Sequence, residues 1–458
     1  MLKSKLEKKF SSFLENFHKE TKYYLAVSGG VDSMALLGLF LGEETILKEQ
    51  ITILHFNHKI RQESDQDEQF LEDFAEEHGV FFRSKSLNII DLAKKEKNSI
   101  ENQGRLCRYC FFQEAMQGEK EAVLVTGHHL EDQTESIFLH LIRGAGMEGL
   151  IGMRTFDYFP DRNMCIFRPL LEFSKDKLIS FCKRKKISWH EDWTNQSREY
   201  VRNFFRLDIL PAIRKEVNPN LDEALYRLSE ILYEENAYLD HKAKKLFQEI
   251  SYQSSSNYQE KFGFSSFRNN LAFQGMGIEK TLFLKAPIAL QRRMIRLLYP
   301  FSFEEVERIL EVFSKGPGKR LILYDMIFLS DYDAVIVFSK DRLKEIEKGD
   351  FLHFQKEMID DGDCFVTDQS VCFVNMEGLD EEMFSFRTYQ SDDYFHHMGG
   401  GKKELRKLFN SWKLSSLLRK NWPIFCYQNE ILWVPFCGRS GLYLAKKNKR
   451  LLRIEGRI

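Results

Sequence analysis

The chain has 458 residues, of which 43% are hydrophobic and 29% are charged, and its 67 Lys and Arg nearly balance its 68 Asp and Glu. These proportions exclude collagen, coiled coil and wholesale disorder, and the length suggests about three domains. A net charge of −1 would also argue against a nucleic-acid-binding protein if the charges were evenly spread. They are not: residues 399–458 carry 14 Lys and Arg against 3 Asp and Glu, whereas residues 358–398 carry 10 acidic residues and one Arg. This asymmetry indicates either a polyanionic partner or an acidic loop beside a solvated basic face.

The first 200 residues alternate between apolar runs and amphipathic segments. Apolar runs predict buried strands and amphipathic segments predict helices. The expected strands are 23–27, 51–56, 80–83 and 122–126, and the expected helices are 34–40, 67–78, 101–116 and 130–142. This order indicates an α/β fold with a mostly parallel sheet covered on both faces. Ligands of such sheets bind at the carboxyl ends of the strands, so the loops after residues 27, 56 and 126 are the expected site.

The rest of the chain has a different pattern. Residues 221–298 have the spacing of helices, residues 319–339 predict short strands, and the acidic stretch and a compact basic module follow. We therefore expect four parts along the chain: an α/β domain, a helical domain, an acidic linker and a small α+β domain. Their predicted bounds are 1–215, 216–320, 321–383 and 384–458.

Eight cysteines are scattered along the chain. The first residues predict an amphipathic helix with too many charges for a signal peptide, and no apolar run approaches the roughly 18 residues of a membrane span. We expect a cytoplasmic protein with free thiols and no membrane contact. Cys107 and Cys110 have the spacing of a zinc or redox pair. Because no second pair stands at ligand spacing, we favour two small hydrophobic side chains packed on one helix.

A glycine-rich hexapeptide joins the first expected strand to the first expected helix. Its residues are Ser28, Gly29, Gly30, Val31, Asp32 and Ser33. Two glycines allow a tight turn and a close approach to a ligand, and a helix N-terminus binds phosphate. Asp32 would repel bare phosphate, so it either holds Mg²⁺ or caps the helix. The Gly-Lys-Ser/Thr ending of a Walker A loop is absent, and a plain strand-to-helix turn is the alternative.

In this context the hexapeptide is the signature of the PP-loop ATP pyrophosphatases, which split ATP into AMP and pyrophosphate. Further segments resemble the tRNA(Ile)-lysidine synthetase family within that superfamily, over about residues 20–215 and 384–458. Lys59 and Ile60 replace its usual Gly-Leu, and Thr134 and Glu135 stand in reverse order. The segments that carry the resemblance are 55–65, 98–109, 127–135, 143–153, 168–171, 191–211 and 400–435.

The resemblance implies a Rossmann-like PP-loop domain and a ligase that forms a carbon–nitrogen bond. The implied reaction activates the wobble cytidine of an isoleucine tRNA with a CAU anticodon by adenylation at its C2 oxygen, and lysine then displaces AMP to give lysidine. ATP, L-lysine and this tRNA are the implied substrates, with Mg²⁺ as a cofactor. The oligomeric state is left open, a homodimer included.

Residue roles follow from the same resemblance. Asp132 and Glu135 also share one helix face by spacing, which suits a lysine ammonium group or a general base, or else a plain surface pair. The basic C-terminal module interleaves its cations with Phe409, Trp412 and Trp422, so bases could stack there, although Phe409 is expected in the core.

The implied catalytic residues are Asp32, Asp132, Glu135, His129 and Arg143. The implied nucleotide-binding residues are the hexapeptide and His58, with Asp32 as the metal ligand. The implied RNA-binding residues are Arg202, Arg206, Lys402, Lys403, Arg406 and Lys407.

Two other functions stay open. A tRNA thiolation enzyme of the same superfamily would need a persulfide-carrying cysteine or an iron–sulfur cluster, for which Cys107 and Cys110 give weak support. A tRNA chaperone with a degenerate ATP fold would not need the intact hexapeptide and the carboxylates Asp132 and Glu135.

Overall fold

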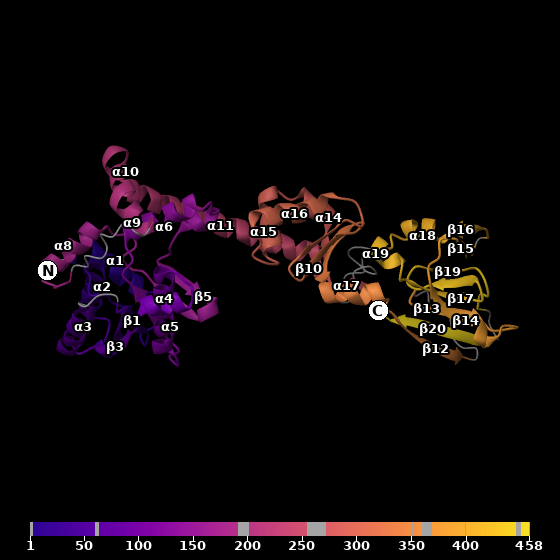
Figure 1. Ribbon diagram of the computed structural model, residues 1–458, viewed down its shortest axis with the longest axis horizontal. Helices are drawn as coiled ribbons and strands as arrows, with labels where there is room; N and C mark the ends of the chain where they lie inside the picture. The colour runs from indigo at the N-terminus through magenta and orange to yellow at the C-terminus, as the bar shows by residue number, and fades with distance from the viewer. Residues whose placement is uncertain are drawn as a thin grey trace. The chain divides into compact units, whose positions relative to one another are not determined.

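The computed structural model of the chain describes residues 3–59, 64–190, 201–253, 272–349, 351–359, 369–398, 400–445 and 450–457. Parts of two family-like segments, residues 60–63 and 191–200, lie outside the described residues. The chain forms two compact units, Met1–Asn236 and Ala237–Ile458, the first drawn in indigo to magenta and the second mostly in orange and yellow (Figure 1). The predicted division into four parts stays a prediction. Within the described residues, no helix has both the length and the apolar character needed to cross a bilayer.

A six-stranded sheet organises unit 1. Its strands run in the order β3-β2-β1-β4-β6-β5, all parallel except β5, which pairs antiparallel with β6. The predicted parallel sheet is therefore confirmed. The chain order reverses between β1 and β4, so a ligand crevice is expected at their carboxyl ends. The strands are β1 (Lys22–Ala26), β2 (Ile51–Asn57), β3 (Phe81–Ser86), β4 (Ala122–Thr126), β5 (Phe156–Phe159) and β6 (Met164–Phe167).

Helices cover both faces of this sheet. Because side chains alternate along a strand, Tyr23 and Leu25 pack into one apolar cluster and Tyr24 into another. The first cluster includes residues of α1 (Lys5–Leu14), α2 (Val31–Leu41), α3 (Ser64–His78) and α8 (Lys175–Lys185). The second includes residues of α4 (Ile89–Lys95) and α5 (Ile100–Met116). Strands buried on both faces read as continuous apolar runs, which is why they could be predicted.

Helix α8 is fixed tightly against α2, the helix that follows the hexapeptide. A Cβ added at Gly38 of α2 would lie 2.2 Å from Ile187 Cδ1 and 3.4 Å from Phe181. The Cys182 thiol lies 3.8 Å from the Val31 carbonyl oxygen. These contacts hold the C-terminal half of α8, and Ile187 just beyond it, against α2.

The remaining helices of unit 1 follow either β4 or β6 in the chain. They are α6 (Leu130–Ile142), α7 (Met147–Ile151), α9 (Val201–Phe204), a π-helical segment η4 (Phe205–Ile209) and α10 (Leu210–Glu216). A long helix, α11 (Leu221–Ile250), begins in unit 1 and ends in unit 2. The predicted helix at 130–142 is confirmed.

The expectation of helices throughout 221–298 is wrong at two short strands, β7 (Ser251–Gln253) and β8 (Met276–Glu279), which pair with each other. β8 also pairs with β11, and a Cβ at Gly277 would lie 2.0 Å from the ring of Tyr252. Pairing between strands and the lack of a side chain at Gly277 determine that this segment forms β-strands. Neither feature can be read from the spacing of its apolar residues. The helices beside these strands are α14 (Lys280–Lys285), α15 (Ile288–Arg296) and α16 (Phe303–Ser314).

Unit 2 contains four sheets among its described residues. The five-stranded sheet has the order β7-β8-β11-β10-β9, and the others are β12-β20-β13, β14-β17-β18-β19 and β15-β16. The stretch expected as an acidic linker contributes strands to two of these sheets in its described part. The new strands are β9 (Arg320–Leu323), β10 (Met326–Ser330), β11 (Ala334–Ser339), β12 (His353–Ile359), β13 (Val371–Asn375), β14 (Phe384–Thr388), β15 (Tyr394–His396), β16 (Lys402–Glu404), β17 (Pro423–Tyr427), β18 (Glu430–Val434), β19 (Gly438–Arg439) and β20 (Leu451–Arg457). The helices are α17 (Lys340–Lys348), α18 (Leu405–Ser411) and α19 (Ser416–Arg419).

Candidate functional site

The hexapeptide forms a hydrogen-bonded loop between β1 and α2. The Ser28 backbone N–H donates to Ser33 Oγ at 3.2 Å, and Ser33 Oγ donates to the Gly30 carbonyl at 2.9 Å. Gly29 has a φ of +89°, a left-handed conformation that favours glycine. Since α2 begins at Val31, its first N–H groups lack intrahelical partners. The loop is therefore built to accept an anion.

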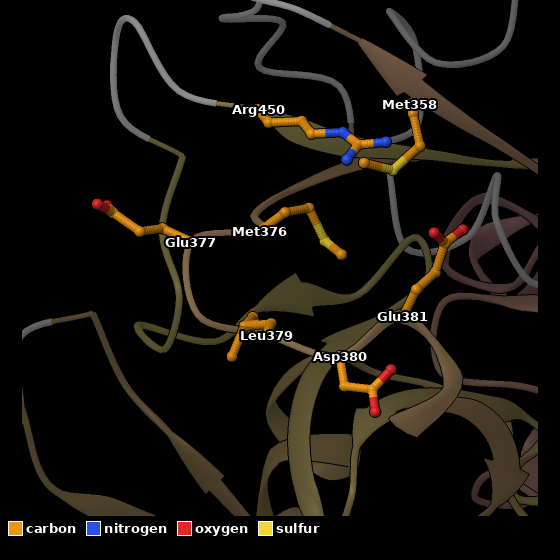
Figure 2. Close-up of a pocket in the computed structure, with 7 residues that line it drawn as sticks. All are labelled: Met358, Met376, Glu377, Leu379, Asp380, Glu381 and Arg450. Carbon is orange, nitrogen blue, oxygen red and sulfur yellow. The ribbon is translucent and has the colours of Figure 1, made fainter.

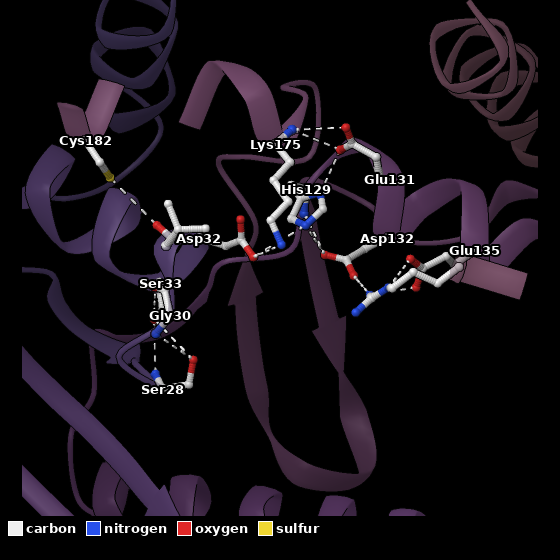
Figure 3. Close-up of polar contacts among 12 residues, drawn as sticks. Ser28, Gly30, Asp32, Ser33, His129, Glu131, Asp132, Glu135, Lys175 and Cys182 are labelled. Carbon is white, nitrogen blue, oxygen red and sulfur yellow. Dashed lines mark hydrogen bonds and ion pairs between the residues drawn. The ribbon is translucent and has the colours of Figure 1, made fainter. Parts of the chain in front are cut away.

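The loop after β4 touches the hexapeptide because Gly127 has no side chain. A Cβ at Gly127 would lie 3.3 Å from the Asp32 carbonyl carbon and oxygen and from the Ser33 nitrogen. The close approach places His129, at the start of α6, beside Asp32, with His129 Nε2 at 3.6 Å from Asp32 Oδ2. Figure 3 shows the two side chains facing one another from the two loops.

His129 is a buried cation. Its Nδ1 lies 2.8 Å from Glu131 Oε2, and its Nε2 lies 3.4 Å from Asp132 Oδ2. Burial opposes the charged ring, but the hydrogen bonds with Asp32 and Glu131 and the nearby Asp132 raise the pKa of His129 to about 10. At neutral pH both ring nitrogens are protonated, so His129 can donate to a phosphate but cannot serve as a base.

The neighbouring histidine has the opposite character. Burial lowers the pKa of His128 to about 4, and its Nδ1 lies 2.8 Å from Thr126 Oγ1. His128 is therefore neutral at physiological pH.

Asp132 and Glu135 form an acidic pair on one face of α6, as the spacing predicted. They are 8% and 2% exposed, and both are bound to two guanidinium groups. Arg202 donates to Glu135 at 2.8 Å and to Asp132 at 3.1 Å, and Arg206 donates to Glu135 at 2.6 and 2.8 Å and to Asp132 at 3.1 Å. Burial alone would raise the pKa of Asp132, but the charges of His129, Arg202 and Arg206 hold it at about 2.

Asp32 has one carboxylate oxygen available for a cation. Its Oδ1 is buried and has no hydrogen-bond partner among the described residues, while Oδ2 faces His129 and lies 3.8 Å from Lys175 Nζ. Mg²⁺ in nucleotide sites is usually held by one or two carboxylates together with substrate phosphates. Asp32 fits that donor set. Within the part of the chain that the structure describes, no three His, Cys, Asp or Glu side chains form a protein-only metal cage.

Two members of this cluster had no signal in the sequence, Glu131 and Lys175. The Glu131 carboxylate accepts from the Lys175 backbone N–H at 3.1 Å and binds His129 Nδ1. Figure 3 shows the Lys175 side chain extending from Glu131 towards Asp32. Glu131 stood at a variable position of its motif and Lys175 at an ordinary helix start, so neither could be recognised without the fold.

Comparison with known proteins identifies two known domains in the chain. A model of the PP-loop domain matches residues 2–213, and a model of the TilS substrate C-terminal domain matches residues 384–455. A tRNA(Ile)-lysidine synthase of Chlorobaculum tepidum is 36% identical over 252 residues, which cover 54% of this chain and 73% of that protein. This chain belongs to the tRNA(Ile)-lysidine synthase family.

Two other members of the tRNA(Ile)-lysidine synthase family align with nearly the whole chain. The Persephonella marina protein is 28% identical over 478 residues, covering 98% of this chain and 99% of its own. The Clostridium tetani protein is 27% identical over 459 residues, covering 96% and 95%. The expected resemblance, fold class and ligase class are confirmed, and the PP-loop domain implies the use of ATP.

Two residues expected at the site of this family member lie apart from the cluster. Arg143 is exposed at the C-cap of α6, about 20 Å from His129 by the rise of a 13-residue helix. His58 is half-buried at the end of β2, where Gly104 of α5 leaves room for its ring. Burial and the nearby Arg108 lower the pKa of His58 to about 4. Their predicted catalytic and nucleotide-binding roles stay predictions.

The C-terminal module separates its cations from its aromatic side chains. The expected RNA-binding residues Lys402, Lys403, Arg406 and Lys407 are all exposed on β16 and α18. Phe409 is in the core, as expected. The prediction that RNA bases could stack on Trp422 is wrong, because this side chain is 0% exposed and its Nε1 donates to the Pro435 carbonyl at 3.1 Å. Trp412 is half-buried against Phe395.

The cysteine prediction is half right. Cys107 packs against the apolar cluster that includes residues of α5, but Cys110 is exposed. Both thiols are free.

A separate hollow of about 430 Å³ lies in unit 2. Figure 2 shows the Asp380 and Glu381 carboxylates and the Arg450 guanidinium around the thioether of Met376. None of the site residues expected from the sequence lines it, so the candidate site remains the cluster between the hexapeptide and α6.

Proposed function

We propose that this chain ligates lysine to C2 of the wobble cytidine in an isoleucine tRNA with a CAU anticodon. The cytidine O2 attacks the α-phosphate of ATP and releases pyrophosphate. The lysine ε-amine then attacks C2, AMP leaves with O2, and the amine loses a proton. The observation that carries this proposal is a buried acidic pair beside a phosphate loop, within a chain of the tRNA(Ile)-lysidine synthase family.

The hexapeptide and His129 would bind the ATP phosphates. The free N–H groups at the start of α2 and the Ser28 hydroxyl can donate to phosphate oxygens, and the His129 imidazolium adds a fixed positive charge. Asp32 would hold a Mg²⁺ ion, which neutralises phosphate charge when bound. The support for Mg²⁺ is the buried, unpartnered Oδ1 of Asp32 among the described residues.

Asp132 and Glu135 would bind the lysine ammonium group. At present Arg202 and Arg206 occupy these carboxylates, so the ammonium can bind only when a guanidinium group moves. Both arginine side chains are about one third exposed and can turn outwards. The displaced arginines would then be free to bind RNA phosphates. This exchange would link the catalytic role predicted for the two carboxylates with the RNA-binding role predicted for the two arginines.

The exposed cations of the C-terminal module would bind the tRNA backbone. Lys402, Lys403 and Arg406 have no acidic partner among the described contacts, whereas Lys407 is paired with Glu404 at 2.9 Å. We infer a cytoplasmic location because ATP, lysine and tRNA meet there. A homodimer stays a prediction.

The decisive experiment supplies the protein with ATP, radiolabelled lysine and an unmodified isoleucine tRNA transcript. We expect one lysine per tRNA, located at the wobble cytidine by nuclease digestion, and no incorporation into a transcript with uridine at that position. A double variant, Cys107→Ala with Cys110→Ala, should retain this activity. Loss of activity in that variant, or sulfur incorporation instead of lysine, would contradict the proposal and favour thiolation.

A further inference from the structure

We propose that Lys175 binds the polyphosphate of ATP and supplies, from a different helix, the positive charge that the hexapeptide lacks. The inference deepens the proposed function and depends on it only in taking ATP as the substrate.

The hexapeptide contains no cationic residue. A Walker A loop carries its own lysine next to the phosphates, but the first turn of α2 carries Asp32 instead. A helix N-terminus offers only about half an elementary charge, which is small compared with the charge of a triphosphate. The site therefore needs cations from other elements.

The cations around the loop differ in their freedom to move. His129 is 5% exposed and lies among three carboxylates, and Arg206 is bound to Asp132 and Glu135 at 2.6 to 3.1 Å. The side chain of Lys175 is 49% exposed, and its ammonium is 3.8 Å from Asp32. A contact this long at an exposed position contributes little energy, so Lys175 can exchange Asp32 for a phosphate oxygen at small cost.

The backbone of Lys175 is nevertheless fixed. Its N–H donates to both oxygens of Glu131 at 3.1 Å, which ties the start of α8 to the start of α6. The contact of Cys182 with the Val31 carbonyl, and the packing on Gly38 of Ile187 just beyond the end of α8, tie α8 to α2. Helical side chains project towards the helix N-terminus, and Figure 3 shows Lys175 reaching the hexapeptide from that end of α8. A flexible cation on a fixed base can follow a phosphate chain without rearranging the site.

The test compares Lys175→Ala with Lys177→Ala, which removes another exposed cation two residues along the same helix. In the full chain, the KM for ATP should rise about tenfold or more in Lys175→Ala, the loss expected for one charge-assisted hydrogen bond. The KM values for lysine and tRNA should stay within about twofold of the original, and Lys175→Arg should recover most of the ATP affinity. Lys177→Ala should resemble the original protein in all three constants.

A non-hydrolysable ATP analogue, titrated by calorimetry, separates this inference from the proposed function. The proposed function fails if the unchanged protein binds the analogue in calorimetry but forms no lysidine when it is given ATP, lysine and tRNA. In that case, a tenfold weaker binding of the analogue by Lys175→Ala still supports the inference. If lysidine forms and Lys175→Ala binds the analogue as tightly as the unchanged protein, the inference is overturned alone. An equal rise in all three KM values, or the same rise in Lys177→Ala, would also overturn it.

Discussion

The charged residues of the unit 1 site and those of the C-terminal module in unit 2 are arranged in opposite ways. Glu135 is 2% exposed and accepts three hydrogen bonds from two arginines, whereas Lys402 and Lys403 lie exposed on β16. Buried charges are costly without partners, so removing one partner has a large effect. Exposed charges interact through water and are screened by salt. The first arrangement suits positioned chemistry and the second suits attraction to an RNA backbone.

This comparison predicts two kinds of variants. Changes at Gly127 and at the carboxylates of the unit 1 site should alter turnover and leave the salt dependence of tRNA binding alone. Changes in the C-terminal module should weaken tRNA binding in a salt-dependent way and leave turnover at saturating tRNA alone.

The largest effect is expected from Glu135→Gln. In the proposed function the lysine ammonium would lose one of its two carboxylates, and the two arginines would lose a buried partner. Lysine incorporation should therefore fall by about 100-fold or more. The measurement is single-turnover incorporation at saturating ATP and tRNA. Glu148→Gln, an exposed site on α7, should change the rate less than twofold. Unchanged turnover in Glu135→Gln, together with weaker tRNA binding, would break the comparison.

A smaller loss is expected from Gly127→Ala. The new Cβ would lie 3.3 Å from the backbone of Asp32 and Ser33, so the two loops must separate by a few tenths of an ångström and His129 must shift from Asp32. Because such misplacement weakens catalysis, kcat/KM for ATP should fall about tenfold with tRNA affinity unchanged. Gly146→Ala is the matched control, since its Cβ would meet no described atom within 4 Å. Equal losses in both variants would show that the close contact at Gly127 is unimportant.

The C-terminal module should affect tRNA binding alone. Replacing Lys402, Lys403 and Arg406 together by Ala should weaken tRNA binding about tenfold at moderate salt. The slope of log affinity against log salt should flatten by roughly 0.7 to 0.9 for each lost phosphate contact. Filter binding at several salt concentrations measures both quantities. Lys407→Ala should have a smaller effect, because Lys407 is already paired with Glu404. An unchanged slope in the triple variant would show that these three residues make no contact with tRNA phosphates.

The parts of the fold and site that could be predicted are those with local patterns. The buried strands of unit 1 are continuous apolar runs, the hexapeptide follows the first of them, and Asp132 and Glu135 share a face because they are three residues apart. Each of these relations lies within a few residues of sequence, where helix and strand geometry decide which side chains are neighbours.

The parts that could not be predicted depend on distant partners. The sequence gives the charge of Arg202 but not its contact with Glu135, 67 positions away. Lys175 looks like an ordinary helix start, and only the packing of α8 on α2 brings it to Asp32. Trp422 stands among cations in the sequence, yet its ring packs against Phe351 in the core. In each case the sequence contains many residues of the same chemical type, and only the tertiary structure determines which of them are in contact.

The smallest expected effect is on stability, through the two half-buried neutral histidines of unit 1. Burial lowers the pKa of His58 and His128 to about 4, whereas an unfolded histidine has a pKa of about 6.5. Between these values the unfolded chain binds protons that the folded chain does not, so the free energy of unfolding should fall as the pH drops from 6.5 towards 4. The contribution is complete above pH 6.5, and its loss reaches at most about 2 kcal/mol per histidine at pH 5.

Urea unfolding at pH 7 and pH 5 measures this loss. His58→Gln and His128→Gln should each reduce the difference between the two pH values by about 1 to 2 kcal/mol, because glutamine does not titrate. His353→Gln is the control, since His353 is exposed on β12 of unit 2 and should leave the difference unchanged. Equal effects of all three substitutions would mean that burial does not distinguish the histidines of unit 1 from those of unit 2. The energetic difference between the buried titratable groups of unit 1 and the exposed ones of unit 2 would then apply only to Asp132 and Glu135 of α6.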